Sequence, residues 1–538
     1  MIFLPGLENG GTDAPATSLS RSMGKIEAKV NARRRSAWAG TAGVAVTLGV
    51  TELLAGLSPS IPSAISSIGS YVVDVTPAWL ESFAISTFGT ADKAVLGLSM
   101  VIVALLFGWL LGNNSSVSPW PILIGFALFA IVGIAAQLGD AAAETGIVVV
   151  STLIAGVVGL LTWYGIREWT KPKERDVTDG DIPSIERRRL LLAVGAAATV
   201  SVLMIGVGRA KIRSRAEAQL EALDLPVPFT AEKDPTGEND FDLKLVAPIV
   251  VSNTTFYRID TALVVPAIDP EEWTLTIHGM VDKEVVLTYD DILNMPLVEK
   301  YATLACVSNE VGDHLVGNAL WTGVPLPDIL NLAGVQPGAD QIVGRSVDGW
   351  TAGFPTELAF DGRDALLAVG MNREILPANH GFPARLVIPG LYGYVSATKW
   401  ITEIELTTWD GFDGYWIPRG WAKEGPIKTQ SRVDRPKSGG RIPIGTYVFG
   451  GVAWAPTVEI EQVEVQMDDG PWQTAELTEP LSTNSWIQWA FETDVSEGPH
   501  TLRVRATDRT GQTQSELRVA PRPNGAEGWH MIRFVATT

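Results

Sequence analysis

The sequence contains one cysteine and five histidines in 538 residues. A single cysteine excludes an intrachain disulfide framework, a cysteine-based zinc finger and a cysteine-ligated iron–sulfur cluster. Basic residues are also scarce, since 41 lysines and arginines face 60 aspartates and glutamates, a net charge of −19. A chain this acidic lacks the basic face that phosphates require, so we expect no nucleic-acid partner. Its positive mean hydropathy, with 19% charged residues, favours membrane segments.

Charge and hydropathy divide the chain into two unlike parts. Residues 1–215 carry 18 basic and 15 acidic side chains, whereas residues 216–538 carry 23 and 45. The first part contains five apolar runs close to the ~20 residues that span a bilayer core. These runs cover residues 37–57, 94–112, 122–139, 146–166 and 190–208. Buried helices of a large globular protein are the alternative, but aromatic residues typical of membrane interfaces flank the runs: Trp38, Trp109, Trp120, Trp163 and Tyr164. We therefore expect a five-helix transmembrane bundle over residues 1–208.

Basic residues beside the apolar runs predict how the bundle is oriented. Lys25, Lys29 and Arg33–Arg35 precede the first run, and a second basic loop lies over residues 167–189, between the fourth and fifth runs. Because basic loops stay in the cytoplasm, both signals place the N-terminus inside and the part after residue 208 outside. We expect a multi-pass protein of the bacterial plasma membrane, in contact with lipid. A smaller basic group argues against this orientation: Arg209, Lys211, Arg213 and Arg215.

Two features of the runs leave alternatives open. The stretch Ser184-Ile-Glu-Arg-Arg-Arg-Leu-Leu-Leu resembles an internal twin-arginine export signal, although an ordinary positive-inside anchor explains the same arginines. Export through that route would carry the C-terminal part across the membrane already folded. Glu52 is the one charged residue inside any run. We expect it either to be exposed at the membrane interface or to take part in proton transfer or partner contact.

The remaining chain predicts further domains. Residues 209–245 are expected to be a linker that contains a short amphipathic helix over 216–223. Short β-rich runs such as Trp273–His278 then alternate with helical patterns, which predicts an α+β domain over 246–436. Short strands separated by turns predict a C-terminal immunoglobulin-like β-sandwich over 437–538. The chain is therefore expected to be a multi-domain protein.

The only thiol, Cys306, lies at the end of the strand-like run Tyr301-Ala-Thr-Leu-Ala-Cys and before a polar loop. A lone buried cysteine is usually just a small apolar side chain. However, Thr254-Thr-Phe-Tyr-Arg-Ile-Asp and the stretch from Asn379 to Trp400 offer amide and cationic donors in turn-rich sequence. Such donors suit an anionic ligand, and a thiolate beside them can bind a soft or redox-active metal.

At these residues the sequence resembles the sulfite oxidase family of molybdopterin-dependent oxidoreductases. The resemblance covers residues 250–530 and consists of long elements in the family's order. These elements are Thr303–Cys306, Asn318–Leu326, Met371–Arg385, Lys399-Trp400, Gly425–Arg432, Gly451–Ala455 and Asp469–Trp472. The last two match the family's dimerisation domain, so the resemblance implies a homodimer formed through the C-terminal domain.

The resemblance also implies roles for particular residues. The thiolate of Cys306 would be the catalytic metal ligand, binding molybdenum beside the sulfurs of one pterin. Arg385 and Lys399 suit phosphate oxygens, although the lysine matches only after a one-residue insertion following Gly393. The full set implied to hold the pterin and its phosphate is Thr254, Tyr257, Arg258, Ser346, His380, Arg385, Ser396, Thr398 and Lys399. Structural ion pairs for the arginines and turn roles for the others are the alternatives.

The sequence departs from the family at the substrate site. Sulfite-oxidising members carry an arginine five positions after the metal cysteine, where this chain has Val311, with Glu310 and Asp313 nearby. The family's active-site tyrosine falls at Gly420 or Trp421. Because an acidic rim without that arginine repels a dianion, we expect oxygen-atom transfer on an S-oxide, N-oxide or related small molecule rather than on sulfite.

The histidines bear on electron supply. None of them lies in a predicted span, which excludes a membrane haem held by two histidines within this chain: His278, His314, His380, His500 and His530. No Cys-x-x-Cys-His attachment site exists either. We therefore expect quinone or a separate redox protein as the electron partner. The alternatives are a membrane-anchored binding module with the same fold but no turnover, and a transporter, which the scarcity of polar residues within the runs disfavours.

Overall fold

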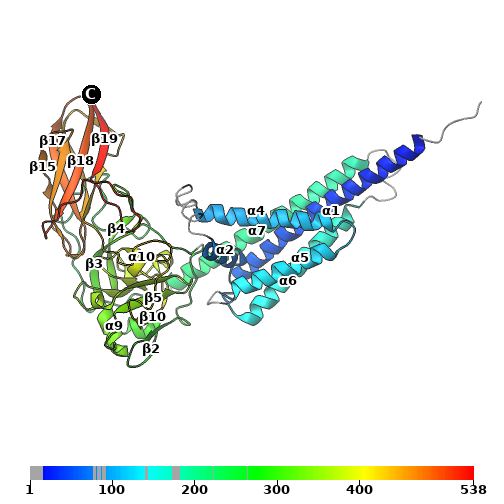
Figure 1. Ribbon diagram of the computed structural model, residues 1–538, viewed down its shortest axis with the longest axis horizontal. Helices are drawn as coiled ribbons and strands as arrows, with labels where there is room; N and C mark the ends of the chain where they lie inside the picture. The colour runs from blue at the N-terminus through cyan, green and yellow to red at the C-terminus, as the bar shows by residue number, and fades with distance from the viewer. Residues whose placement is uncertain are drawn as a thin grey trace, which may run out of the picture. The chain divides into compact units, whose positions relative to one another are not determined.

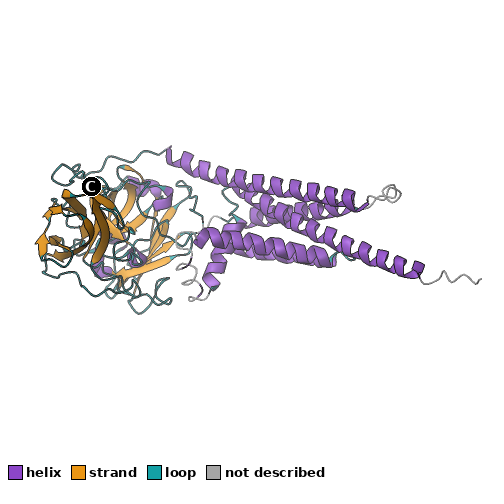
Figure 2. Ribbon diagram, turned by 90° about the horizontal axis from the view of Figure 1, so that it is seen from above, coloured by secondary structure: helices purple, strands orange, loops and turns teal. Residues whose placement is uncertain are grey.

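The chain folds into two compact units that divide between Ser214 and Arg215. In the computed structural model the first unit is helical and the second is rich in strands (Figures 1 and 2). Much of the expected basic loop over 167–189 lies outside the described residues, including Lys173 and Arg175. The structure describes residues 16–76, 80, 87, 92–139, 143–171, 182–221, 223–262 and 264–538.

Long apolar helices make up the first unit. Its helices are α1 (Ala16–Leu57), α2 (Ala64–Val75), α4 (Asp92–Asn114), α5 (Trp120–Gln137), α6 (Thr145–Trp169) and α7 (Ile182–Glu221). Among the described residues, five segments are long and apolar enough to cross a membrane: Lys29–Leu57, Lys93–Asn114, Trp120–Gln137, Thr145–Trp169 and Arg187–Arg215. The five helices expected from the apolar runs are therefore present, whereas their insertion and orientation in a membrane stay predictions.

Glu52 is fully buried in the helical unit, so the expectation that it is exposed at an interface is wrong. One of its carboxylate oxygens accepts hydrogen bonds from the Ser63 hydroxyl, at 2.7 Å, and from the N–H of Ile65, at 3.3 Å. Its other oxygen lies 3.7 Å from Nε of Arg209 on α7. Because Ser63 caps α2, Glu52 holds α2 and α7 against α1. Its role in proton transfer stays a prediction.

Two helices differ from their expected bounds. Helix α2 lies between the first two apolar runs, where no helix was expected from the sequence, and its 12 residues are too few to span a bilayer. Helix α7 is continuous to Glu221, so the region expected to be a linker from residue 209 begins as helix. The short helix expected over 216–223 is the end of α7. Described residues between Leu223 and Ala262 form no helix or strand.

Two sheets mixed with short helices form the first part of the strand-rich unit. One sheet has the order β2 (Val285–Thr288), β1 (Thr274–Gly279), β10 (Ile401–Thr407), β5 (Gln341–Ser346), β6 (Thr351–Pro355). The other contains β3 (Val298–Ala305), β4 (Val316–Pro325), β7 (Leu366–Met371), β8 (Glu374–Ile375), with β9 (Arg385–Val387) paired to β7. The helices are α8 (Tyr289–Leu293), α9 (Leu326–Ala333), α10 (Gly393–Ser396) and the single turns Thr356–Ala359 and Ala378–His380. One apolar core, with Ile277, Trp321 and Leu386 at its centre, joins both sheets.

Two further sheets share a second core. The first has the order β11 (Gln430–Arg435), β13 (Gly445–Trp454), β17 (Ile487–Val495), β16 (Glu476–Leu477). The second has the order β12 (Arg441–Pro443), β19 (His530–Thr537), β18 (Gly498–Asp508), β14 (Ile460–Met467), β15 (Trp472–Thr474). Phe449 on β13, Val463 on β14 and Trp489 on β17 lie in this core. Pairing begins with β11, before the boundary expected at residue 437, and the immunoglobulin-like type of this region stays a prediction.

Candidate cofactor site around Cys306

Cys306 opens the loop of a β-hairpin. Strands β3 and β4 pair as far as Ala305 and Val316, and the ten residues between them start at the cysteine. The N–H of Cys306 donates to the carbonyl oxygen of Leu315 at 2.9 Å, and its own carbonyl accepts from the N–H of Asn309 at 3.0 Å. The thiol is buried. The end of an apolar strand therefore holds the sulfur in place, while the polar sequence after it forms the loop.

The surroundings of the thiol disfavour an unpaired thiolate. Burial raises the pKa of Cys306, and hydrogen bonds from Ser308 only partly oppose that rise. Burial, followed by the nearby Cys306 charge, also raises the pKa of Tyr257, and burial raises the pKa of Tyr392 to about 12. A bound metal cation would reverse the balance at the sulfur, because a coordinating thiol is deprotonated. Tyr392 was not singled out from the sequence.

Four of the expected cofactor residues converge in a cationic cluster, consisting of Arg258, His380, Arg385 and Lys399. Burial is the main cause that lowers the pKa of His380 to about 4, and the charges of the other three members contribute. Burial likewise lowers the pKa of Lys399 to about 8, although the neighbouring Asp260 opposes the shift. His380, Arg385 and Lys399 are therefore buried close to one another, whereas Arg258 lies at the exposed edge of the cluster.

Asp260 offsets only part of this positive charge. One of its carboxylate oxygens accepts from Nε of Arg258 at 2.8 Å and from Nζ of Lys399 at 2.7 Å. At pH 7 three cations, Arg258, Arg385 and Lys399, thus face one carboxylate. Sequence reasoning missed Asp260 as a site residue, although it ends the motif that begins at Thr254. The excess of cations suits an anionic ligand such as a phosphate.

Arg385 is the least compensated of the three cations. Its side chain is buried, and among the residues that the structure describes it has no carboxylate partner. Its Nη1 donates to the carbonyl oxygen of His380 at 3.1 Å, and its guanidinium lies over the ring of Trp321, 5.0 Å from the centroid. Burial lowers the pKa of Arg385 to about 10. A buried charge of this kind is costly unless it is paired, so the site fits a ligand that brings the missing anion.

A glycine allows the arginine and the lysine to approach each other. Gly381 has a φ of +118°, in the left-handed region. A Cβ at this position would lie 3.1 Å from the Cβ atoms of both Arg385 and Lys399. Any larger residue would therefore push the two cations apart. The sequence supplies the required glycine within the run His-Gly-Phe-Pro, residues 380–383.

An aromatic stack links the cluster to the chain before it. Phe256 meets Trp321 and His380 edge-on, with centroids 5.8 and 5.7 Å apart, and stacks on Tyr257 at 5.1 Å. Nε2 of His380 lies 2.7 Å from the carbonyl oxygen of Asn253. Because a carbonyl only accepts, Nε2 carries the proton and Nδ1 retains its lone pair. The histidine thus offers the site an acceptor.

The expected hydroxyl residues fall into two groups. Ser346 Oγ and Thr398 Oγ1 are buried and have no hydrogen-bond partner within the described part of the chain. Ser346 ends β5, and Thr398 lies three residues before β10, which pairs with β5. A buried hydroxyl without a partner costs about 1–3 kcal/mol, so both suit a ligand with polar atoms. By contrast, the hydroxyl of Ser396 donates to the Tyr392 carbonyl, and that of exposed Thr254 bonds to Ser252.

The positions where the sequence departs from the family are apolar or aromatic. Val311 is buried. Trp421 lies 5.8 Å from the ring of Tyr394 and 6.5 Å from that of Trp416. The hydroxyl of Tyr394 donates to the carbonyl of Ala422 at 2.6 Å, which fixes the segment of Trp421 beside α10. Where a sulfite-oxidising member would offer an arginine and a tyrosine, this chain therefore has buried Val311 and either Gly420 or Trp421, with aromatic surface around the latter.

Comparisons with known proteins agree with this chemistry. The sequence model of a family described as "Oxidoreductase molybdopterin binding domain" matches residues 262–416. The chain is 34% identical over 157 residues to an uncharacterised oxidoreductase, YuiH, of Bacillus subtilis, covering 29% of this chain and 76% of that protein. It is 29% identical over 318 residues to the mitochondrial sulfite oxidase of Drosophila melanogaster, covering 49% of this chain and 55% of the relative. The chain belongs to the sulfite oxidase family of molybdopterin-dependent oxidoreductases.

More distant matches extend the comparison. The chain is 27% identical over 317 residues to the NADH-dependent nitrate reductase of Cucurbita maxima, covering 47% of this chain and 34% of that enzyme. The sulfane dehydrogenase SoxCD of Paracoccus pantotrophus, a solved structure, is 25% identical with a TM-score of 0.47, covering 52% of this chain and 80% of the other. The chain thus spans about half the length of the Drosophila sulfite oxidase that it matches. The expected family, the expected class of enzyme and the expected molybdenum–molybdopterin cofactor are confirmed.

Proposed function

We propose that this protein is a membrane-anchored oxidoreductase that transfers an oxygen atom to or from an S-oxide, N-oxide or related small molecule, outside the cytoplasm. One observation supports the cofactor site most strongly: the guanidinium of Arg385 is buried and has no carboxylate partner among the described residues. It is close enough to Tyr257 to lower the pKa of that phenol, and the charge of Cys306 raises the same pKa. The same region contains the unpaired hydroxyls of Ser346 and Thr398. Charge, thiol and unpaired polar atoms together fit a pterin phosphate with a bound metal.

Each group would hold a different part of the cofactor. Arg385, Lys399 and Arg258 would bind the phosphate, because guanidinium and ammonium groups form strong charge-assisted hydrogen bonds with its oxygens. Ser346, Thr398 and Nδ1 of His380 would meet the polar edge of the pterin. Tyr257, Ser396 and Thr254 complete the set that the family resemblance implies. The thiolate of Cys306 would be the protein's ligand to molybdenum, which when bound supplies the two-electron chemistry of oxygen-atom transfer.

The substrate proposal depends on charge. At the position matching the family's arginine, Val311 offers no cation, and Glu310 and Asp313 add negative charge nearby. Coulomb repulsion would therefore lower the local concentration of a dianion such as sulfite. The aromatic cluster of Tyr394, Trp416 and Trp421 can instead bury the apolar part of an uncharged substrate.

The location and the partners are proposed from the helical unit and from family membership. Five helices of membrane-spanning length, with basic residues before the first and the last, support an anchor with its N-terminus inside. The arginines Arg187–Arg189 would act as a twin-arginine signal or as an ordinary anchor. Quinone or a separate redox protein would exchange electrons with the site, and the C-terminal sheets would form a homodimer.

Metal and pterin analysis of the purified full-length protein tests the proposal. We expect close to one molybdenum and one pterin per wild-type chain. Cys306→Ser removes the soft ligand, so activity is expected to fall at least 100-fold, since an essential ligand to the reacting metal is lost. Turnover is measured with dimethyl sulfoxide, trimethylamine N-oxide and sulfite. Wild type from molybdenum-replete cells that lacks both metal and pterin would refute the proposal.

The main competing function predicts a different result in the same assay. A binding module with this fold would retain pterin and metal but show no turnover with any of the three substrates, in either direction of electron flow. Its Cys306→Ser variant would then match wild type in activity. This alternative is a serious one because Val311 stands where the family has its substrate-binding arginine, and Gly420 or Trp421 where it has its active-site tyrosine.

A further inference from the structure

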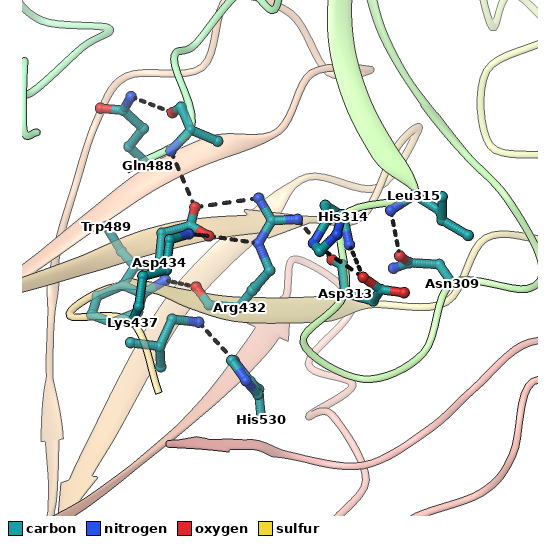
Figure 3. A network of polar contacts seen from close by, with 12 residues as sticks. Asn309, Asp313, His314, Leu315, Arg432, Asp434, Lys437, Gln488, Trp489 and His530 are labelled. Carbon is teal, nitrogen blue, oxygen red and sulfur yellow. Dashed lines mark hydrogen bonds and ion pairs between the residues drawn. The ribbon is translucent and has the colours of Figure 1, made fainter. Parts of the chain in front are cut away.

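A buried ion pair on β11 reaches the loop that follows Cys306 (Figure 3). Nε and Nη2 of Arg432 donate to the two carboxylate oxygens of Asp434, at 2.8 and 3.3 Å. The remaining terminal nitrogen, Nη1, donates to the carbonyl oxygen of Asp313 at 2.8 Å. Both side chains are almost completely buried. Two hydrogen bonds to one carboxylate fix the orientation of the guanidinium, so Asp434 keeps Nη1 directed at the Asp313 carbonyl.

The ring of His530 contacts the same loop from β19. Gly312 has a φ of +87°, and a methyl group there would collide with Cδ2 and Nε2 of the ring. The N–H of Val433 donates to Nδ1 of His530 at 3.0 Å, so Nδ1 is unprotonated. Burial, together with the charge of Arg432, lowers the pKa of His530 to about 4. The ring is therefore neutral at pH 7, and its bulk limits how closely Gly312 can approach β19.

The contacted residues belong to the backbone that holds the cysteine. The N–H of Cys306 donates to the carbonyl of Leu315, and the N–H of Leu315 donates to Oδ1 of Asn309 at 2.8 Å. Gly312 and Asp313 lie between Asn309 and Leu315 in the chain. A shift of either residue would thus be passed to the hydrogen bond that fixes Cys306.

We propose that Arg432 is a positioning residue for the Cys306 thiolate, acting through Asp313 while His530 limits the opposite movement of the loop. The proposal rests on the function proposed above, in which this thiolate binds molybdenum. None of the residues expected from the sequence to hold the cofactor belongs to this network. Residues that orient a metal ligand without touching the metal typically change affinity or activity by about 10–100-fold when they are replaced.

Arg432→Lys in the full-length protein is the direct test. Lysine keeps a charge beside Asp434 but lacks the fork, so it cannot serve both carboxylate oxygens and the Asp313 carbonyl. We expect unchanged molybdenum and pterin content, a shifted thiolate-to-metal charge-transfer absorption and a kcat lowered about tenfold. The matched control is Arg435→Gln on the same strand, whose side chain donates to the Val448 carbonyl and lies over Tyr447. It should leave the absorption and kcat unchanged.

The outcomes separate the two proposals. Wild-type absorption and kcat in Arg432→Lys would overturn the positioning role, even if the wild-type protein contains molybdenum. Wild type without molybdenum and pterin would overturn the function itself. If Arg432→Lys does not fold, Gly312→Ala moves the same loop from the His530 side without touching the ion pair. An unshifted absorption in that variant would overturn the positioning role, and a shifted one would support it.

Discussion

Replacing Arg385 with methionine should have opposite effects on the cofactor-free and the cofactor-bound protein. Burial lowers the pKa of this arginine to about 10. A base with a lowered pKa in the folded state destabilises the fold by a constant amount below that pKa. For Arg385 the cost begins to fall as pH rises through about 10 and disappears only above the ordinary pKa of arginine. At 1.36 kcal/mol per pKa unit, the charge costs the cofactor-free protein about 3 kcal/mol at pH 7. Arg385→Met removes that cost.

The substitution also removes two hydrogen-bond donors. The carbonyls of His380 and Leu386 lose their bonds from the guanidinium, which costs about 1 kcal/mol each. The methionine sulfur can replace the contact of the guanidinium with the Trp321 ring, so a net stabilisation of about 1 kcal/mol remains for the cofactor-free protein. In the loaded protein, the lost bond to a phosphate oxygen is worth about 1.5–3 kcal/mol. Cofactor affinity should therefore fall about 10-fold to 150-fold.

Thermal unfolding of cofactor-free and cofactor-loaded protein at pH 7 measures both effects. We expect the Tm of cofactor-free Arg385→Met to rise by about 2 °C and that of the loaded variant to fall. The matched control is Arg363→Met, because Arg363 pairs with Asp361 and donates to the Pro389 carbonyl. It should lower the Tm in both states. If cofactor-free Arg385→Met loses as much stability as Arg363→Met, the assignment of Arg385 as an uncompensated charge is wrong.

Two further substitutions test the charge and the substrate preference of the site. Because burial lowers the pKa of Lys399 to about 8, its charge is present below that pH and lost above it. Cofactor uptake by cofactor-free wild type should weaken as pH rises through about 8, whereas Lys399→Arg should keep its uptake to higher pH; identical profiles would contradict the phosphate role. Val311→Arg restores a cation at the family's position and should lower the KM for sulfite about tenfold. The KM for dimethyl sulfoxide should not fall, and a parallel fall would show that charge does not select the substrate.

Local patterns in the sequence predicted the features that depend on neighbouring residues. Apolar runs of bilayer length predicted the five long helices, and the end of the run before Cys306 placed the thiol at a strand end. Helix α2 was missed because its first turn is held by Glu52 on another helix, which accepts hydrogen bonds from the N-cap Ser63 and from the N–H of Ile65. The same limitation applies to Asp260, whose partner Lys399 is 139 positions away. Nothing near Asp260 in the sequence indicates that pairing.

Family resemblance named candidate cofactor residues but not how their surroundings differ. It named Arg385 and Ser396 alike. The structure buries Arg385 with no anionic partner in the described part of the chain, whereas the hydroxyl of Ser396 donates to the carbonyl of Tyr392 at the start of α10. Burial and hydrogen-bond partners depend on the folded arrangement of β5, α10 and β10. A sequence motif shows which side chains are present, but not how many hydrogen-bond or ionic partners each side chain has in the folded protein.

The bond from Arg432 to Asp313 also sets an order of events during synthesis, because the two residues are 119 positions apart. A ribosome that adds 5–20 residues per second needs roughly 6–24 s to make the intervening chain. Throughout that interval the hairpin loop lacks the ion pair that fixes it, and the only thiol of the chain lacks its final geometry. With the positioning role proposed for Arg432, loading of the cofactor should therefore follow translation of β11.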